Sequence, residues 1–207
     1  MSKSEHPFAP AAPAGLMVLT FYLSCLFPVL IGTAPEEMIY VLIPLGLAGG
    51  IVQLSSGIME LRCGMIVPGN IMCGFSAFMF LGMGENILKL FKLIPAHTAA
   101  VDGYVFMVMG LYMVGFTLPF LHKNLVAGIF MITTDIFFCG CGISWLFGLP
   151  IFFKIATWSL VPIVITAMWQ AIAEVLNHSM GREIVKMGAP LLKGTGQLKP
   201  ADALQIH

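Results

Sequence analysis

Long apolar runs separated by short polar connectors dominate the chain. Six such runs occur, each near the roughly 20 residues that a helix needs to cross a bilayer core. The pattern predicts an all-α, polytopic membrane protein with six transmembrane helices, over residues 14–31, 38–59, 65–83, 101–121, 125–147 and 155–176. The domain organisation expected from this pattern is a cytoplasmic N-terminal lead (1–13), a six-helix transmembrane domain (14–178) and a cytoplasmic C-terminal tail (179–207).

The third run contains helix-breaking residues near its start. Pro68 and Gly69 follow Gly64, and the polar Asn70 comes directly after them. Because an irregular backbone at membrane depth survives only against protein or a watery cavity, we expect a broken helix that lines a pore or binding site. The alternative is a bent helix packed on its neighbours through small residues. After this run, the spacing of apolar residues and lysines over 85–93 predicts a short interfacial helix.

Composition strengthens the membrane interpretation. Hydrophobic residues make up 58% of the 207 residues and charged residues 10%, and the mean hydropathy is +0.94. A net charge of zero gives no indication of nucleic-acid binding. The first apolar run lacks a signal-peptidase pattern, so it is expected to stay as a helix.

Basic residues set the expected orientation. Seven fall on the side that holds both termini and three on the other, which predicts a multi-pass protein of the plasma membrane with both termini in the cytoplasm. The seven are Lys3, Arg62, Lys123, Arg182, Lys186, Lys193 and Lys199, and the three are Lys89, Lys92 and Lys154.

Candidate chemistry inside the spans is sparse. No hydrolase, P-loop or metalloprotease motif occurs and the histidines lie near ends or loops, so we expect no enzyme, no metal site and no cofactor. Asp135 is either a proton-coupling group or a structural one that accepts hydrogen bonds from Thr133 or Thr134. Glu174 is expected to form a surface or intersubunit ion pair with Arg182. Since no Lys or Arg lies within a span core, the cargo should be a small monocarboxylate handled with a proton, or a small neutral solute.

Three motifs carry a resemblance to a known family. The stretch Pro10-Ala-Ala-Pro13-Ala-Gly-Leu16 loosely matches one that opens the family's first span. The second span ends in Gly49-Gly50-x-x-Gln53-x-x-x-Gly57-x-x-Glu60, and the sixth in Ala173-Glu174-Val-Leu-Asn177-x-x-x-Gly181-Arg182. On these residues the chain resembles the acetate uptake transporter family, the succinate–acetate permeases of bacteria and archaea and their fungal relatives.

The resemblance implies a six-helix protomer with its own pore, assembled into a homo-hexamer in the lipid bilayer. It further implies acetate as cargo, succinate in some members, with or without proton coupling. The family's pore constriction falls on Leu19, Phe75 and Thr134, where the family has Phe, Tyr and Leu, and a further small pore-lining position falls on Ala167.

The leading hypothesis is therefore a transporter or channel for acetate and similar small monocarboxylates. Phe75 and Leu19 would form a dry gate, and polar and small side chains would line the pore or bind cargo, namely Gln53, Asn70, Ser76, Thr133 and Ala167. One alternative is a hexameric channel for urea, short amides or ammonia. The other is a non-transporting membrane sensor or scaffold whose polar tail binds a partner.

Overall fold

The computed structural model describes residues 11–95 and 98–192, and every regular element in these ranges is a helix. Most of the predicted lead and the tail beyond Leu192 lie outside the described residues. The elements are α1 (Ala12–Leu30), the 3-10 helix η1 (Glu36–Val41), α2 (Leu42–Arg62), α3 (Ile66–Leu90), α4 (Ala99–Leu121), α5 (Leu125–Phe147) and α6 (Pro150–Met180).

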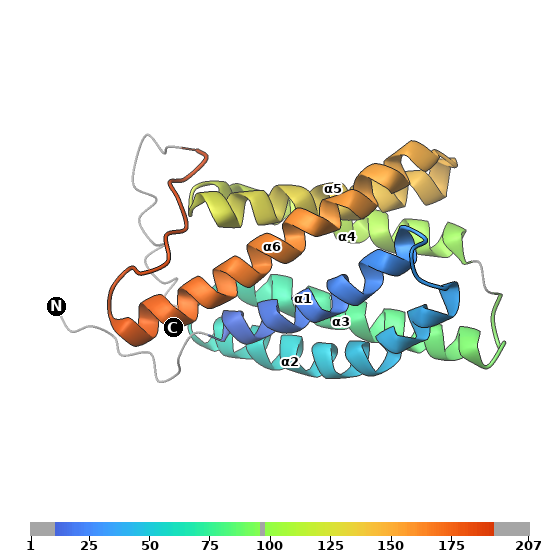
Figure 1. Cartoon of the computed structure of the whole chain (residues 1–207), viewed down its shortest axis with the longest axis horizontal. Helices are drawn as coiled ribbons and strands as arrows, with labels where there is room; N and C mark the ends of the chain where they lie inside the picture. Colours follow the sequence, from blue (N-terminus) through green and yellow to red (C-terminus); the bar gives the residue numbers. More distant parts are fainter. Residues whose placement is uncertain (1–10, 96–97, 193–207) are drawn as a thin grey trace, which may run out of the picture.

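The six long helices form an elongated bundle whose neighbours follow the order α3, α2, α1, α6, α5, α4 around a common axis (Figure 1). The backbones of α3 and α4 make few contacts, and aromatic side chains bridge the space between them. The ring of Phe78 on α3 lies 4.9 Å from Phe106 on α4 and 5.1 Å from Phe138 on α5, edge to face in both cases. The bundle is thus closed by helix packing on one side and by aromatic rings on the other.

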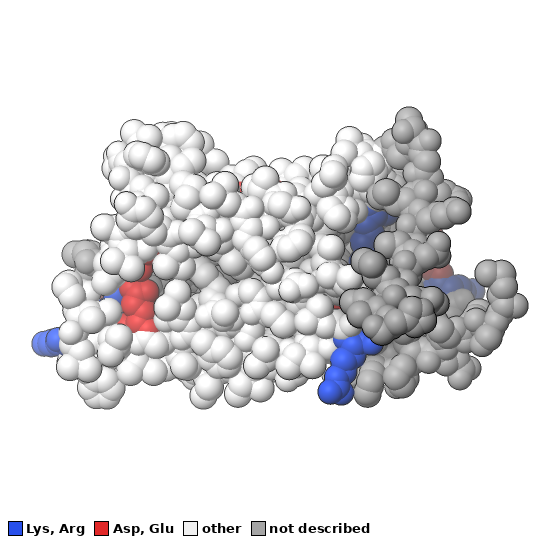
Figure 2. Space-filling view, turned by 180° about the vertical axis from the view of Figure 1, so that it is seen from behind, with Lys and Arg blue, Asp and Glu red and all other residues white. Residues whose placement is uncertain are grey.

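The surface of the bundle is that of a membrane protein. All six helices are long and apolar enough to cross a membrane, as the hydropathy pattern predicted. Figure 2 shows Lys, Arg, Asp and Glu gathered at the two ends of the molecule, with a broad and nearly uncharged band between them. Along α4, the large apolar side chains of Val101, Tyr104, Val108 and Leu111 are exposed, as expected for a face in contact with lipid.

Helix α3 is continuous, so the predicted break in the third span is wrong. Pro68 lies in its first turn, where the backbone N–H groups have no partner within the helix and proline removes nothing. The amide of Asn70 donates to the carbonyl of Ile66 one turn back, at 2.8 Å. The separate interfacial helix over 85–93 is also wrong, because α3 extends to Leu90 and carries a Glu85–Lys89 ion pair of 2.6 Å.

The glycine motif at the end of the second span has a packing role. The α-carbon of Gly57 lies so close to α3 that a Cβ atom there would be 2.7 Å from Cys73 Sγ and 2.9 Å from the carbonyl oxygen of Gly69. At Gly50 the carbonyl accepts a hydrogen bond of 2.8 Å from Ser76 Oγ. Small residues on α2 therefore allow α2 and α3 to pack backbone against backbone.

The end of the sixth span folds back across the bundle. Gly181 adopts the left-handed conformation (φ 61°) that ends α6. The side chain of Asn177 then holds residues 184 and 185, accepting from the Val185 N–H at 2.9 Å and donating to its carbonyl at 2.8 Å. Further on, the Val126 N–H donates to Met187 O and the Leu192 N–H to Leu121 O. We call residues 182–192 the strap, because they join α6 to the α4–α5 turn.

Candidate functional site

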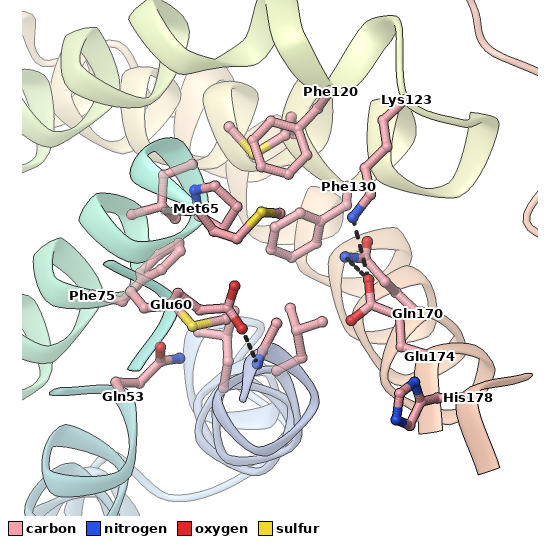
Figure 3. Close-up of a pocket in the computed structure, with 17 residues that line it drawn as sticks. Gln53, Glu60, Met65, Phe75, Phe120, Lys123, Phe130, Gln170, Glu174 and His178 are labelled. Carbon is pink, nitrogen blue, oxygen red and sulfur yellow. Dashed lines mark hydrogen bonds and ion pairs between the residues drawn. The ribbon is translucent and has the colours of Figure 1, made fainter. Parts of the chain in front are cut away.

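A cavity of about 270 Å³ opens inside the bundle at the end where α1 begins and α6 ends. We call it the vestibule (Figure 3). Its walls come from α1, α2, α3, α5 and α6, the end of α4 and the α4–α5 turn. Most of the lining is apolar, and the polar side chains on it are Gln53, Glu60, Lys123, Gln170, Glu174 and His178.

A second and much smaller cavity lies deeper in the bundle. Its volume is about 20 Å³, close to the space that one water molecule needs. Leu19 and Phe75 line both cavities and are buried, so these two side chains separate them. Thr134 lines the small cavity but not the vestibule, and its hydroxyl donates to Phe130 O within α5 at 2.7 Å. All three predicted constriction residues thus line the small cavity, most of whose lining is apolar, and their role as a constriction stays a prediction.

Two buried glutamines present unpartnered carbonyl oxygens at the vestibule. Gln53 (1% exposed) donates through Nε2 to Gly15 O at 2.9 Å, and Gln170 (5% exposed) donates through Nε2 to Glu174 Oε1 at 3.3 Å. Since each Nε2 already faces an acceptor, each Oε1 points elsewhere, and neither has a hydrogen-bond partner. Both oxygens are buried, and that of Gln53 lies against Gly15 on α1, so each is an acceptor left without a hydrogen bond beside the cavity.

Glu60 also lines the vestibule, although no role was predicted for it beyond its place at the end of the glycine motif. Its buried Oε1 accepts from the backbone N–H groups of Ala11 at 2.8 Å and Ala12 at 2.9 Å. A carboxylate at a helix N-terminus satisfies free N–H groups and complements the positive end of the helix dipole. The final residue of the glycine motif therefore fixes the start of α1 at the mouth of the vestibule.

Within the described residues of one protomer, Glu174 does not form the ion pair predicted with Arg182, and a pair between subunits stays a prediction. Glu174 Oε1 instead lies 3.3 Å from Lys123 Nζ. Gly181 turns the chain away from the axis of α6, which carries Arg182 off the face that holds Glu174. Lys123 lies in a short turn and was expected only to contribute to the orientation, yet that turn brings its side chain to the vestibule.

Four predicted pore residues line neither cavity. Asn70 and Thr133 bond to carbonyls of their own helices, and Ser76 bonds to Gly50 O across the α2–α3 contact. Ala167 is fully buried in α6. The hydroxyls of Ser76 and Thr133 and the Nδ2 of Asn70 bond to backbone carbonyls, and none of the four residues lines either cavity. Any role of these residues in binding cargo stays a prediction.

Asp135 joins two helices instead of facing the path. Its Oδ2 accepts from Thr117 Oγ1 on α4 at 2.7 Å, and its Oδ1 is buried without a partner. The bonds expected from Thr133 and Thr134 are not formed, because both hydroxyls donate to carbonyls one turn back in α5. Asp135 lines neither cavity, and its coupling role stays a prediction.

Comparison with known proteins gives a match in structure. No family model matches the chain, and no curated protein sequence matches it. Among solved structures, the chain is similar to the bacterial acetate channel SatP, with a TM-score of 0.77 and 22% sequence identity over 87% of this chain and 99% of that one. At this identity the likeness shows a shared fold, and it confirms the predicted six-helix architecture.

Proposed function

We propose that this protein is a membrane channel or transporter for acetate and similarly small monocarboxylates, of the acetate uptake transporter family. The observation that carries the proposal is the pair of cavities in series, with the Leu19–Phe75 partition between them. The fold shared with an acetate channel and the two specific sequence motifs add independent support. Polar groups of the vestibule would meet the cargo before it enters the apolar constriction.

The constriction limits the form in which an acid can pass. A bare carboxylate in a dry apolar passage costs many kcal/mol, whereas a protonated acid or a carboxylate that keeps some water costs much less. Passage therefore requires protonation of the acid or a wetter, wider conformation of the constriction. Passage of the protonated acid would couple transport to protons, whereas transport of succinate would require the wetter and wider constriction.

We place both termini in the cytoplasm and the assembly, a homo-hexamer, in the plasma membrane. The excess of basic residues at the end that holds both termini supports the orientation. The exposed apolar faces of α2, α4 and α6 offer surface for lipid and for neighbouring protomers. Native mass spectrometry of the detergent-solubilised protein measures the oligomer, and a monomer would exclude the hexamer.

Labelled acetate uptake into proteoliposomes tests the proposed cargo. We expect saturable uptake above that of protein-free liposomes, with competition by formate and propionate. A panel with lactate, succinate and urea defines the range. Uptake equal to that of empty liposomes, at several values of pH, would exclude the proposed function.

A channel for urea, short amides or ammonia is the second candidate. The free carbonyl oxygens of Gln53 and Gln170 favour it, because they accept hydrogen bonds from N–H donors. A protonated acid donates to the same oxygens, so the two candidates differ in the cargo and share the site. Uptake of labelled acetate and of labelled urea, each with the other solute as unlabelled competitor, separates them, since a urea channel would take up urea and show no saturable acetate uptake.

A further inference from the structure

The carboxylate of Glu174 occupies the mouth of the vestibule in the manner of a small acid. Its Oε1 accepts from two donors at once, Lys123 Nζ and Gln170 Nε2, each at 3.3 Å. Figure 3 shows Lys123 reaching from the α4–α5 turn toward Glu174 and Gln170 on α6, with the two dashed lines meeting at the same carboxylate oxygen. A cation and a buried amide therefore converge on one position in the cavity.

Both contacts are of a kind that another carboxylate can replace. Charge-assisted bonds between an ammonium group and a carboxylate are shortest near 2.7–2.9 Å, and these two are longer. The Lys123 side chain is 41% exposed and that of Glu174 is 18% exposed, so solvent screens the pair and it adds little to stability. Gln170 is held in the protein interior, whereas Glu174 can leave the pair by rotating its side chain.

The backbone that carries Lys123 is fixed from two sides. Asn124 caps α5 by accepting from the Ala127 N–H at 2.9 Å, and the strap bonds to Leu121 and Val126 on either side of the turn. The backbone of Lys123 therefore keeps this side chain within reach of the vestibule mouth when Glu174 leaves. The other acidic group on the cavity, Glu60, is bonded to the start of α1, and His178 also lines the mouth.

We propose that Lys123 and Gln170 form a carboxylate-binding site at the vestibule mouth, and that Glu174 is its tethered competitor. A soluble monocarboxylate binds there by displacing the Glu174 side chain from Lys123 Nζ and Gln170 Nε2. This proposal rests on the proposed function in one respect, that the cargo is a small carboxylate. It places a cation at the vestibule mouth, where the acid would enter the apolar interior.

Substitutions on both sides of the pair test this site by acetate binding and by flux. Equilibrium dialysis of the purified protein with labelled acetate measures binding, and proteoliposome uptake measures half-saturation. Glu174→Gln removes the competitor and should tighten acetate binding about fivefold, the scale of one partly screened charge contact, and Lys123→Gln should weaken it by a similar factor. In the double variant, the gain from Glu174→Gln should disappear. Glu183→Gln and Lys186→Gln remove exposed charges at the same end without touching the cavity, and serve as matched controls.

The outcomes separate the site from the function. Formamide flux should stay the same in all variants, because an uncharged solute does not compete with Glu174. The proposal is overturned if Glu174→Gln weakens acetate binding as Lys123→Gln does, if the controls shift binding equally, or if acetate binding is unchanged in folded variants of normal thermal stability. If the variants change acetate binding but no protein shows acetate flux, the binding site is supported and the transport function is excluded. If acetate flux occurs but no variant changes binding, the transport function is supported and the site is excluded.

Discussion

At the scale of single residues, the partition between the cavities rests on two apolar side chains. Leu19 on α1 and Phe75 on α3 meet where the vestibule ends and the small cavity begins. Phe75 also contacts Phe138, with the ring centroids 6.0 Å apart, so it is held by the aromatic cluster that closes the bundle. An apolar constriction of this kind stops passage by excluding water.

Phe75→Ala should widen the partition and raise acetate uptake by at least about threefold, because water and cargo then pass a larger opening. Uptake of a bulkier acid such as lactate should rise more than that of acetate. Phe116→Ala is the control, since Phe116 packs on Tyr112 and lines neither cavity. Unchanged acetate uptake in Phe75→Ala would remove Phe75 from the gate.

Asp135→Asn tests the coupling role by the pH dependence of acetate uptake. A group that relays protons takes the pH dependence with it when it is replaced, whereas a group that only joins α4 to α5 does not. From its position outside both cavities we expect an unchanged pH profile. A flat profile in Asp135→Asn beside a pH-dependent wild type would instead establish coupling.

Thr117→Val, which leaves the Asp135 carboxylate without its donor, should lower the free energy of unfolding by about 1–3 kcal/mol.

At the scale of elements, glycine decides how closely α2 and α3 approach. Gly57 and Gly69 bring the two backbones together, Gly50 leaves room for the ring of Phe80, and the Gly50 carbonyl accepts a bond from Ser76. On its α1 side, α2 presents Gln53 and Glu60, which bond to the backbone of α1. The motif from Gly49 to Glu60 thus describes a helix that packs on α3 with one face and fixes α1 with the other.

Gly57→Ala should destabilise the protein by about 1–3 kcal/mol, because its Cβ atom would overlap Cys73 and the Gly69 carbonyl. Gly84→Ala, on α3 with no atom within 4 Å of its Cβ position, should be neutral or stabilising by about 0.5–1 kcal/mol. Thermal unfolding of the two variants in the same detergent measures the difference. Equal losses of stability would contradict the close packing of α2 on α3.

At the scale of the whole molecule, the strap holds the two sides of the vestibule mouth together. It is bonded to α6 through Trp169 and Asn177 and to the α4–α5 turn through Leu121 and Val126. The mouth therefore depends on a segment that follows α6 directly but lies far along the chain from the α4–α5 turn. Lys123 and Glu174, 51 positions apart, meet as a result.

Truncation at two points tests the strap. A chain that ends at Leu192 keeps all of the strap contacts described, so acetate uptake should stay close to that of the full chain. A chain that ends at Gly181 loses them, and we expect lower thermal stability and little uptake, because each lost hydrogen bond contributes about 0.5–1.5 kcal/mol. Retained uptake after removal of residues 193–207 would also argue against the sensor or scaffold whose tail binds a partner. Full uptake without the strap would show that the mouth does not need it.

Much of the fold was predictable because a bilayer constrains sequence strongly. Each span must be apolar and about 20 residues long, so hydropathy located all six helices, and 125–147 agrees with α5 to the residue. The break at Pro68 was wrong because proline has opposite effects in the first turn and in the interior of a helix. The sequence pattern could not decide whether Pro68 lies in the first turn or in the interior, since that depends on the residue at which α3 begins.

The sequence by itself determined that the chain lies in a membrane, how many times it crosses, and which faces of α2 must be small. These properties follow from local hydrophobicity and residue size. Only the tertiary structure decided which polar groups face the vestibule, because that depends on contacts between distant residues. It paired Glu174 with Lys123 instead of Arg182, gave Asp135 a partner on α4, and placed Leu19 and Phe75 in the lining of both cavities.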